Sequence, residues 1–155
     1  MDIKSKTHGK KILEVLHDQH EEVMDVLKKI LDSSSSAVSS RKNNFSKLRE
    51  LLYPHMQGEE NLVYPYIRDR TDDKDPIYEA VEEHYAARAV LSDAEDTDVS
   101  DETWHAKIKV LHELLDHHIE EEESVVFSLA DKVMDRDQAR ELADQYEMMT
   151  REVTV

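Results

Sequence analysis

"HMQGEENLVYP", residues 55–65, is repeated in its main features by "HIEEEESVVFS", residues 118–128. Each stretch has a histidine followed four residues later by a glutamate: His55 with Glu59, and His118 with Glu122. Residues four apart lie on one face of a helix, so each stretch places an imidazole and a carboxylate side by side. The repeat indicates two helices that contribute the same pair of polar groups. The other matched positions are Glu60 with Glu123, Val63 with Val126, and Tyr64 with Phe127.

The composition predicts a helical fold. Of the 155 residues only two are Gly and three are Pro, which is too few chain breakers for a fold of many strands. A chain of this length fits one domain and can bury a substantial core. We therefore expect residues 1–155 to form a single all-α domain.

Charge and cysteine content exclude several classes of partner and site. The net charge of −16 opposes binding to nucleic acid and to an anionic membrane surface. The basic N-terminal residues lead into no apolar signal segment, and no apolar run approaches the ~18 residues of a membrane span. We therefore expect a soluble, cytoplasmic protein. Because the chain has no Cys, any bound metal must be held by His and carboxylates.

Apolar residues at steps of three and four predict four long helices, at about residues 8–31, 41–69, 75–94 and 101–132. Asp75 as N-cap and Pro76 mark the start of the third helix. Asp135 and Gln138 resemble a capping box that opens a shorter helix at about residues 136–151. The polar run "DSSSSAVSS", residues 32–40, predicts an exposed connection. Short connections favour an up-down-up-down four-helix bundle over about residues 8–132, with a short additional C-terminal helix.

Polar groups interrupt the apolar face of every long helix near its midpoint. In an antiparallel bundle the midpoints lie at the same depth, so these groups should meet in one layer of the core. Two carboxylates buried there need compensating positive charge, which a pair of metal ions supplies. Nitrogen and oxygen ligands without thiolate suit iron, with manganese or zinc as substitutes. The predicted metal ligands are His20, His55, Glu59, His84, His118 and Glu122.

The elements that carry these ligands resemble the hemerythrin-like (HHE cation-binding) domain family. They are "HDQHEEV" (17–23), "HMQGEENLVYP" (55–65), "EEHYAARAV" (82–90) and "HHIEEEESVVF" (117–127), within about residues 10–130. The order His, His-x3-Glu, His, His-x3-Glu is specific when each element has its own helix. The resemblance implies a non-haem di-iron site, with an oxo or hydroxo bridge in the oxidised form.

The chain departs from the oxygen-carrying hemerythrins, whose third helix has a His-x3-His pair. Here Ala80 and Arg88 stand four residues on either side of His84, so a fifth histidine is missing. A coordination position is then open to water or taken by another residue, for which Tyr85 and His117 are candidates by proximity.

The remaining polar and aromatic residues of interest are expected to have structural roles. His17 is either a histidine at the core boundary or an outer donor that supports a metal ligand. Pro54 and Gly58 weaken the second helix around His55, and a kink there would aim that imidazole. We place Tyr64, Tyr66 and Phe127 in the core, His8, His105, His112 and His117 on the surface, and Glu120, Glu121 and Glu123 on a solvated face.

The sequence supports a di-iron protein that binds or senses dioxygen, peroxide or nitric oxide. The expected partner is thus a small diatomic or peroxide ligand. The alternatives are a di-iron redox enzyme of the peroxidase, catalase or ferroxidase kind, and a module that senses or stores iron. Fold and site type do not choose among these, since carriers, sensors and catalysts share them.

Overall fold

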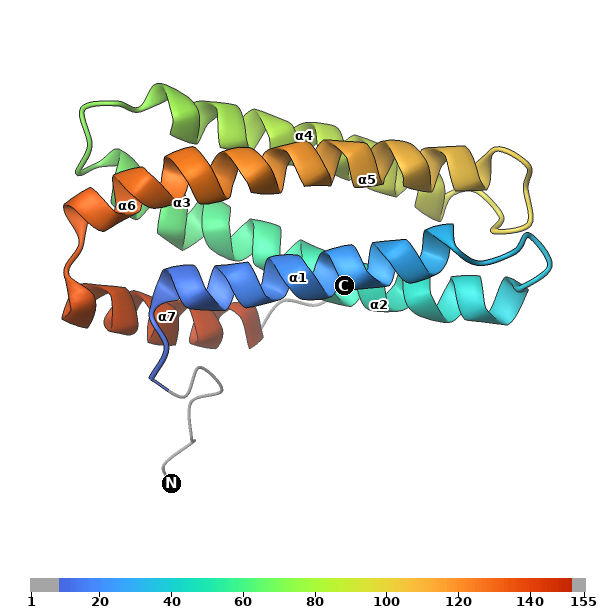
Figure 1. The fold of residues 1–155 in the computed structure, drawn as a ribbon, viewed down its shortest axis with the longest axis horizontal. Coiled ribbons are helices and arrows are strands. Elements are labelled where there is room, and N and C mark those ends of the chain that lie inside the picture. Colours follow the sequence, from blue (N-terminus) through green and yellow to red (C-terminus); the bar gives the residue numbers. More distant parts are fainter. Residues whose placement is uncertain (1–8, 152–155) are drawn as a thin grey trace.

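A computed structural model describes residues 9–151, which form helices joined by short connections (Figure 1). The first rod is α1 (Ile12–Leu31). The second consists of α2 (Val38–Gly58), a π-helical turn η1 (Glu59–Val63) and α3 (Tyr64–Arg68), which follow one another without a break. The third is α4 (Asp75–Glu95), and the fourth consists of α5 (Trp104–Glu121), a second π-helical turn η2 (Glu122–Val126) and α6 (Phe127–Val133). The last helix is α7 (Arg136–Arg151).

The four long rods run alternately up and down (Figure 1). α1 packs against α2 and α5, and α4 packs against α5. α7 turns back at the end of the bundle and packs on α1 and α2. The predicted all-α bundle with an additional C-terminal helix is therefore confirmed, whereas the single domain over residues 1–155 stays a prediction.

Several predicted helix boundaries shift by a few residues. The second helix begins at Val38 rather than residue 41, so the end of the polar connection is helical. The fourth begins at Trp104, because the Asp101 carboxylate accepts hydrogen bonds from the Thr103 amide (2.8 Å) and hydroxyl (2.6 Å) and holds a turn there. Local side-chain bonds thus compete with the first turn of that helix.

The two predicted N-caps have different outcomes. The capping box before α7 is confirmed: the Gln138 amide donates to Asp135 Oδ1 (2.8 Å), and the Asp135 amide donates to Gln138 Oε1 (2.9 Å). Asp75, in contrast, is the first residue of α4 rather than its N-cap. Lys74 occupies the cap position and makes no side-chain capping bond.

The core consists of two apolar clusters, one in each half of the bundle. The first lies at the end where α1 meets α2 and α4 meets α5, and it includes Leu27, Leu48, Trp104 and Leu111. The second lies at the other end and includes Ile67, Ile77, Val126 and Leu142, so α7 contributes to it. The predicted ligands lie between the two clusters in sequence on every rod. The fold therefore places them in one layer at the middle of the bundle.

The two π-helical turns correct the predicted inward faces. The Tyr64 amide bonds to the Glu59 carbonyl and the Phe127 amide to the Glu122 carbonyl, five residues apart instead of four. Each turn therefore contains one extra residue, and the buried positions beyond it shift by one. The buried residues are Val63, Ile67 and Val126, whereas Tyr66, which we placed in the core, is half-buried.

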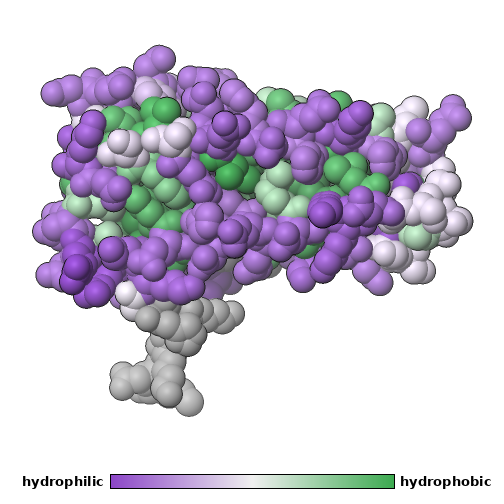
Figure 2. All heavy atoms as spheres, in the orientation of Figure 1, coloured by the Kyte–Doolittle hydropathy of each residue, from purple (hydrophilic) through white to green (hydrophobic). Residues whose placement is uncertain are grey.

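Polar side chains cover most of the face shown in Figure 2, and apolar surface is confined to strips between the helices. Within residues 9–151 no helix is both long enough and apolar enough to cross a bilayer.

Candidate metal centre

The structure brings all six predicted ligands together in the middle layer. His20 comes from α1, His55 from α2 and Glu59 from η1, while His84, His118 and Glu122 come from α4, α5 and η2. Each of the six is buried, with at most 4% of its surface exposed. Their roles as ligands stay predictions, which the geometry below supports.

The imidazoles form two pairs with their Nε2 atoms face to face. The two Nε2 atoms are 3.1 Å apart between His20 and His55, and also between His84 and His118. Donor atoms that share an ion at about 2.1 Å lie about 3.0–3.4 Å from one another, so each pair has the spacing of two ligands on one ion.

The two glutamates lie between the histidine pairs. Glu59 Oε1 is 2.8 Å from His55 Nε2 and 3.4 Å from His84 Nε2, so it approaches both pairs. Glu122 Oε2 does the same, 3.0 Å from His118 Nε2 and 3.5 Å from His20 Nε2. Two groups of side chains can thus hold an ion each, with Glu59 in both: His20, His55, Glu59 and Glu122, and Glu59, His84 and His118.

The outer ring nitrogen of each histidine, Nδ1, donates a hydrogen bond to an oxygen outside the layer. His20 donates to Glu123 (2.7 Å) and His84 to Glu60 (2.9 Å). His118 donates to Glu83 (2.9 Å), and His55 to the amide oxygen of Gln19 (2.8 Å). Because a carboxylate can only accept, these bonds place the ring hydrogen on Nδ1 and leave the Nε2 lone pair directed inward. Metal-bound histidines in proteins are held in this way.

The buried carboxylates fit bound cations. Neither oxygen of Glu59 or Glu122 receives a hydrogen bond from any described residue, although both side chains are enclosed. Isolated buried carboxylates of this kind are very costly, and metal ligation offsets the cost. The residues therefore fit a pair of metal ions.

The same charges raise the pKa of His20 and His118. Burial lowers the pKa of His20, but contact with Glu122 and the charges of Glu122 and Glu59 outweigh it and raise the value to about 9. Burial likewise lowers the pKa of His118, while contacts with Glu122 and Glu83 raise it to about 10. Without metal, the cluster thus holds protons where the ions would sit.

Glu123 corrects a prediction. We expected it on a solvated face, yet its two oxygens accept hydrogen bonds from His20 and, at 2.7 Å, from His17 Nδ1. His17 therefore lies at the outer edge of the cluster, in contact with the acceptor of His20, and its role as support for a metal ligand stays a prediction. Glu60 has the equivalent position on the other rod. The repeat of Glu59-Glu60 as Glu122-Glu123 was the signal for both.

None of the candidates for the missing fifth ligand reaches the cluster. Tyr85 and His117, the two candidates by proximity, are exposed, at 57% of the residue and 63% of the side chain, and point away from the cluster. Ala80 is buried in the second apolar cluster. Arg88 donates two hydrogen bonds to Glu60, at 2.8 and 2.6 Å, on the outer side of His84.

Tyr64 is a further polar residue whose side chain faces the cluster. It is buried in the core as predicted, but its hydroxyl is 3.3 Å from His84 Nε2 and so faces the cluster. Phe127, the matching residue in the repeat, stacks on His20 without a polar group. The difference between Tyr and Phe at this matched position was the sequence signal for a functional role.

The other surface and core predictions have mixed outcomes. Tyr66 is half-buried, as is Phe127. His105 is half-buried and its Nε2 lies 3.1 Å from the Leu31 carbonyl, where it can donate, and His112 is half-buried too, so only His117 of the described surface histidines is exposed. His8 lies outside the described residues. α2 continues through Pro54 to Gly58, and the kink there stays a prediction.

A small apolar cavity adjoins the four histidines. Its volume is about 10 Å³, and besides His20, His55, His84 and His118 it is lined by Val23, Leu52, Met56, Leu115 and Ile119. The apolar lining comes largely from the first cluster, whereas Tyr64 belongs to the second. The cavity and the tyrosine hydroxyl thus approach the centre from opposite halves of the bundle.

Comparison with known proteins identifies the family. Residues 11–130 match the Hemerythrin HHE cation binding domain. Among solved structures, a hemerythrin HHE cation-binding domain-containing protein from Mycobacterium kansasii superimposes with a TM-score of 0.80 at 22% identity, over 92% of this chain and 86% of that one. No curated protein matches the sequence. The match over residues 11–130 shows that this chain belongs to the hemerythrin HHE cation-binding family.

Proposed function

We propose that this protein binds two iron ions between its histidine pairs and uses them to bind or react with dioxygen, peroxide or nitric oxide. The observation that carries the proposal is the pair of enclosed carboxylates, Glu59 and Glu122, which lack hydrogen-bond donors and approach both histidine pairs. Nitrogen and oxygen ligands suit iron, with manganese and zinc as alternatives. Bound iron would supply the electron exchange with the small ligand.

The apolar lining of the small cavity supports an uncharged ligand. A cavity of about 10 Å³ is close to the smallest that holds one water molecule, and its walls are mainly apolar. A charged ligand would lose its hydration there without compensation. The chain therefore favours a small uncharged ligand such as dioxygen, nitric oxide or hydrogen peroxide.

Tyr64 supports a redox reaction as a second candidate. Burial and the charges of Glu122 and Glu59 raise the pKa of its phenol well above the usual value, so the hydroxyl keeps its proton. It can donate a hydrogen bond to a ligand held beside His84 and so orient that ligand. Catalase-like disproportionation, in which two hydrogen peroxide molecules give two water molecules and one dioxygen, moves protons only between the two peroxide molecules and needs no external reductant.

Rapid mixing of the Fe(II)-loaded protein with dioxygen, and separately with hydrogen peroxide, tests the proposal. We expect dioxygen to oxidise the iron and to be consumed. No dioxygen should then be released when the solution is placed under vacuum. Recovery of the oxygen under vacuum would favour carriage over redox chemistry, and no reaction with either reagent would contradict the proposal. Tyr64→Phe should slow peroxide decomposition at least about tenfold, while the control Tyr66→Phe leaves the rate unchanged.

A further inference from the structure

α7 is seated directly against the segment that carries two of the predicted ligands. The Tyr146 ring, 1% exposed, lies on Gly58, the residue before Glu59. A Cβ on Gly58 would lie 2.4 Å from Tyr146 Cε2 and 2.8 Å from Thr150 Cγ2, so any larger residue would push α7 away. Glycine here therefore permits a close contact with α7.

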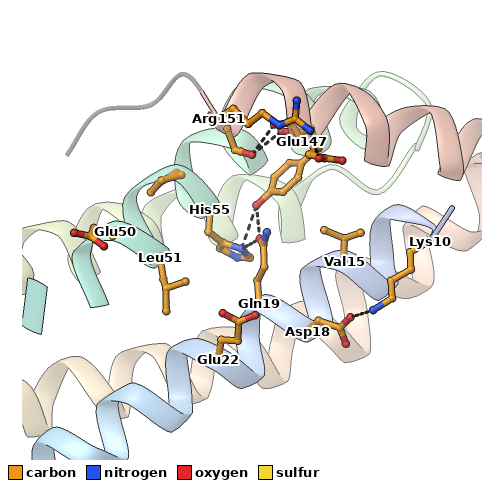
Figure 3. Close-up of a pocket in the computed structure, with 13 residues that line it drawn as sticks. Lys10, Val15, Asp18, Gln19, Glu22, Glu50, Leu51, His55, Glu147 and Arg151 are labelled. Carbon is orange, nitrogen blue, oxygen red and sulfur yellow. Dashed lines mark hydrogen bonds and ion pairs between the residues drawn. The ribbon is translucent and has the colours of Figure 1, made fainter. Parts of the chain in front are cut away.

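The Tyr146 hydroxyl reaches the outer side of His55, where Gln19 also lies (Figure 3 labels His55 and Gln19). It donates a 2.6 Å hydrogen bond to Gln19 Oε1 and lies 3.3 Å from His55 Nδ1. Gln19 Oε1 is also the acceptor for His55 Nδ1. One amide oxygen thus accepts from both the imidazole and the phenol, and the phenol from α7 holds that amide in place.

This arrangement makes His55 different from the other three histidines. His20, His84 and His118 donate to carboxylates, whereas His55 donates to a neutral amide whose oxygen is shared with Tyr146. A carboxylate acceptor makes an imidazole a more basic metal ligand than an amide does. His55 Nε2 is therefore the weakest of the four nitrogen donors.

The outer side of the His20 and His55 pair also borders surface hollows. A cavity of about 510 Å³, drawn in Figure 3, is lined by His55, Gln19 and Tyr146 together with charged residues of α1, α2 and α7. A second of about 470 Å³ is lined by His20, His17 and Glu123. Water can thus approach the outer hydrogen bonds of both histidines in this pair.

We propose that Tyr146 is a positioning residue that holds Gln19 against His55, and that the ion position at His20 and His55 is the weaker of the two. This inference rests on the proposed binding of two ions. The position between His84 and His118 fills first, and the position next to α7 fills last and empties first. The C-terminal helix follows the residues that match the family, and through Tyr146 it determines how readily one ion dissociates.

An anaerobic titration of the metal-free full chain with Co(II), followed by visible absorption and calorimetry, tests this inference. The wild-type protein should bind two ions in two resolved steps. Tyr146→Phe should weaken the second step about tenfold, at the low end of the range for loss of an outer partner of a ligand because Gln19 remains as the acceptor, and should leave the first step within about threefold. The control Tyr53→Phe, which removes a hydroxyl bonded to Glu95 instead, should change neither step.

Gln19→Glu provides an independent variant, because it gives His55 a carboxylate acceptor like those of the other histidines. It should raise the affinity of the second binding step and reduce the difference in affinity between the two steps. The exchangeable ring N–H resonance of His55 in the Co(II)-loaded protein should shift in both variants, which a merely structural role of α7 would not produce. Equal affinities in the wild type, or equal effects on both steps, would overturn the inference. Binding of fewer than two ions would instead overturn the proposed function.

Discussion

Neighbouring glutamates in each repeat have different tasks. Glu59 and Glu122 point into the layer toward the Nε2 atoms of the histidines, whereas Glu60 and Glu123 accept Nδ1–H bonds from histidines of other rods. Under the proposed function, each Glu-Glu pair would provide one carboxylate for an ion and one for an imidazole that holds an ion. Both tasks follow from successive residues pointing about 100° apart on a helix.

Substitution of neighbouring glutamates tests whether metal binding depends on particular carboxylates or only on the number of acidic residues. Glu122→Gln should reduce metal content by at least one ion per chain, because the amide removes a charge from the layer and is a poorer ligand. Glu121→Gln, one residue earlier and half-buried, should retain both ions. Elemental analysis after anaerobic loading and desalting gives the comparison. Equal metal loss from the two variants would show that the assignment of the inward face is wrong.

At the scale of helices, regular periodicity located the four rods and placed all six predicted ligands on inward faces. It sufficed because α1 and α4 contain no π-helical turn, and the predicted ligands of the other two rods lie before or at the start of one. Some of the buried positions that follow each π-helical turn were predicted wrongly. The extra residue of such a turn leaves no pattern in the sequence that periodicity can detect. The outer acceptors were missed for another reason. Half-exposed carboxylates such as Glu123 have the same sequence pattern as a solvated face, and Tyr146 is 91 residues from His55 in the chain.

Gly58→Ala tests the contact between α7 and the second rod. Alanine gains about 1 kcal/mol in helix propensity, but its Cβ would overlap the Tyr146 ring, and overpacking typically costs about 1–3 kcal/mol. We therefore expect chemical denaturation to show a net loss of stability. In a Tyr146→Ala background the same substitution should become neutral or stabilising. A stabilising effect in the wild-type background would contradict the close packing of α7.

At the scale of the whole molecule, the polar layer separates two apolar clusters and concentrates charge where the core is most enclosed. In the metal-free protein, protons on the histidines balance Glu59 and Glu122. The pKa is about 9 for His20 and about 10 for His118, and both values exceed the ordinary 6.5. Their contribution to stability is thus fully present below about pH 6.5 and is lost as the pH rises through 9 to 10.

Thermal unfolding of the metal-free protein should therefore show a falling Tm between pH 7 and pH 10. We expect a decrease of at least ~3 °C, which corresponds to about 1 kcal/mol for a chain of this size. The Tm of the metal-loaded protein should fall less over this range, because the ions bind to deprotonated imidazoles. A metal-free Tm that rises over this range would mean that the histidines are neutral in the folded, metal-free state.

The central claim is that the middle layer holds two iron ions. Iron content per chain, measured after anaerobic loading with Fe(II) and removal of unbound metal, tests it most directly. The six converging side chains, with Glu59 and Glu122 between two histidine pairs, predict two iron ions per chain. A protein that retains one ion or none under these conditions would contradict the account.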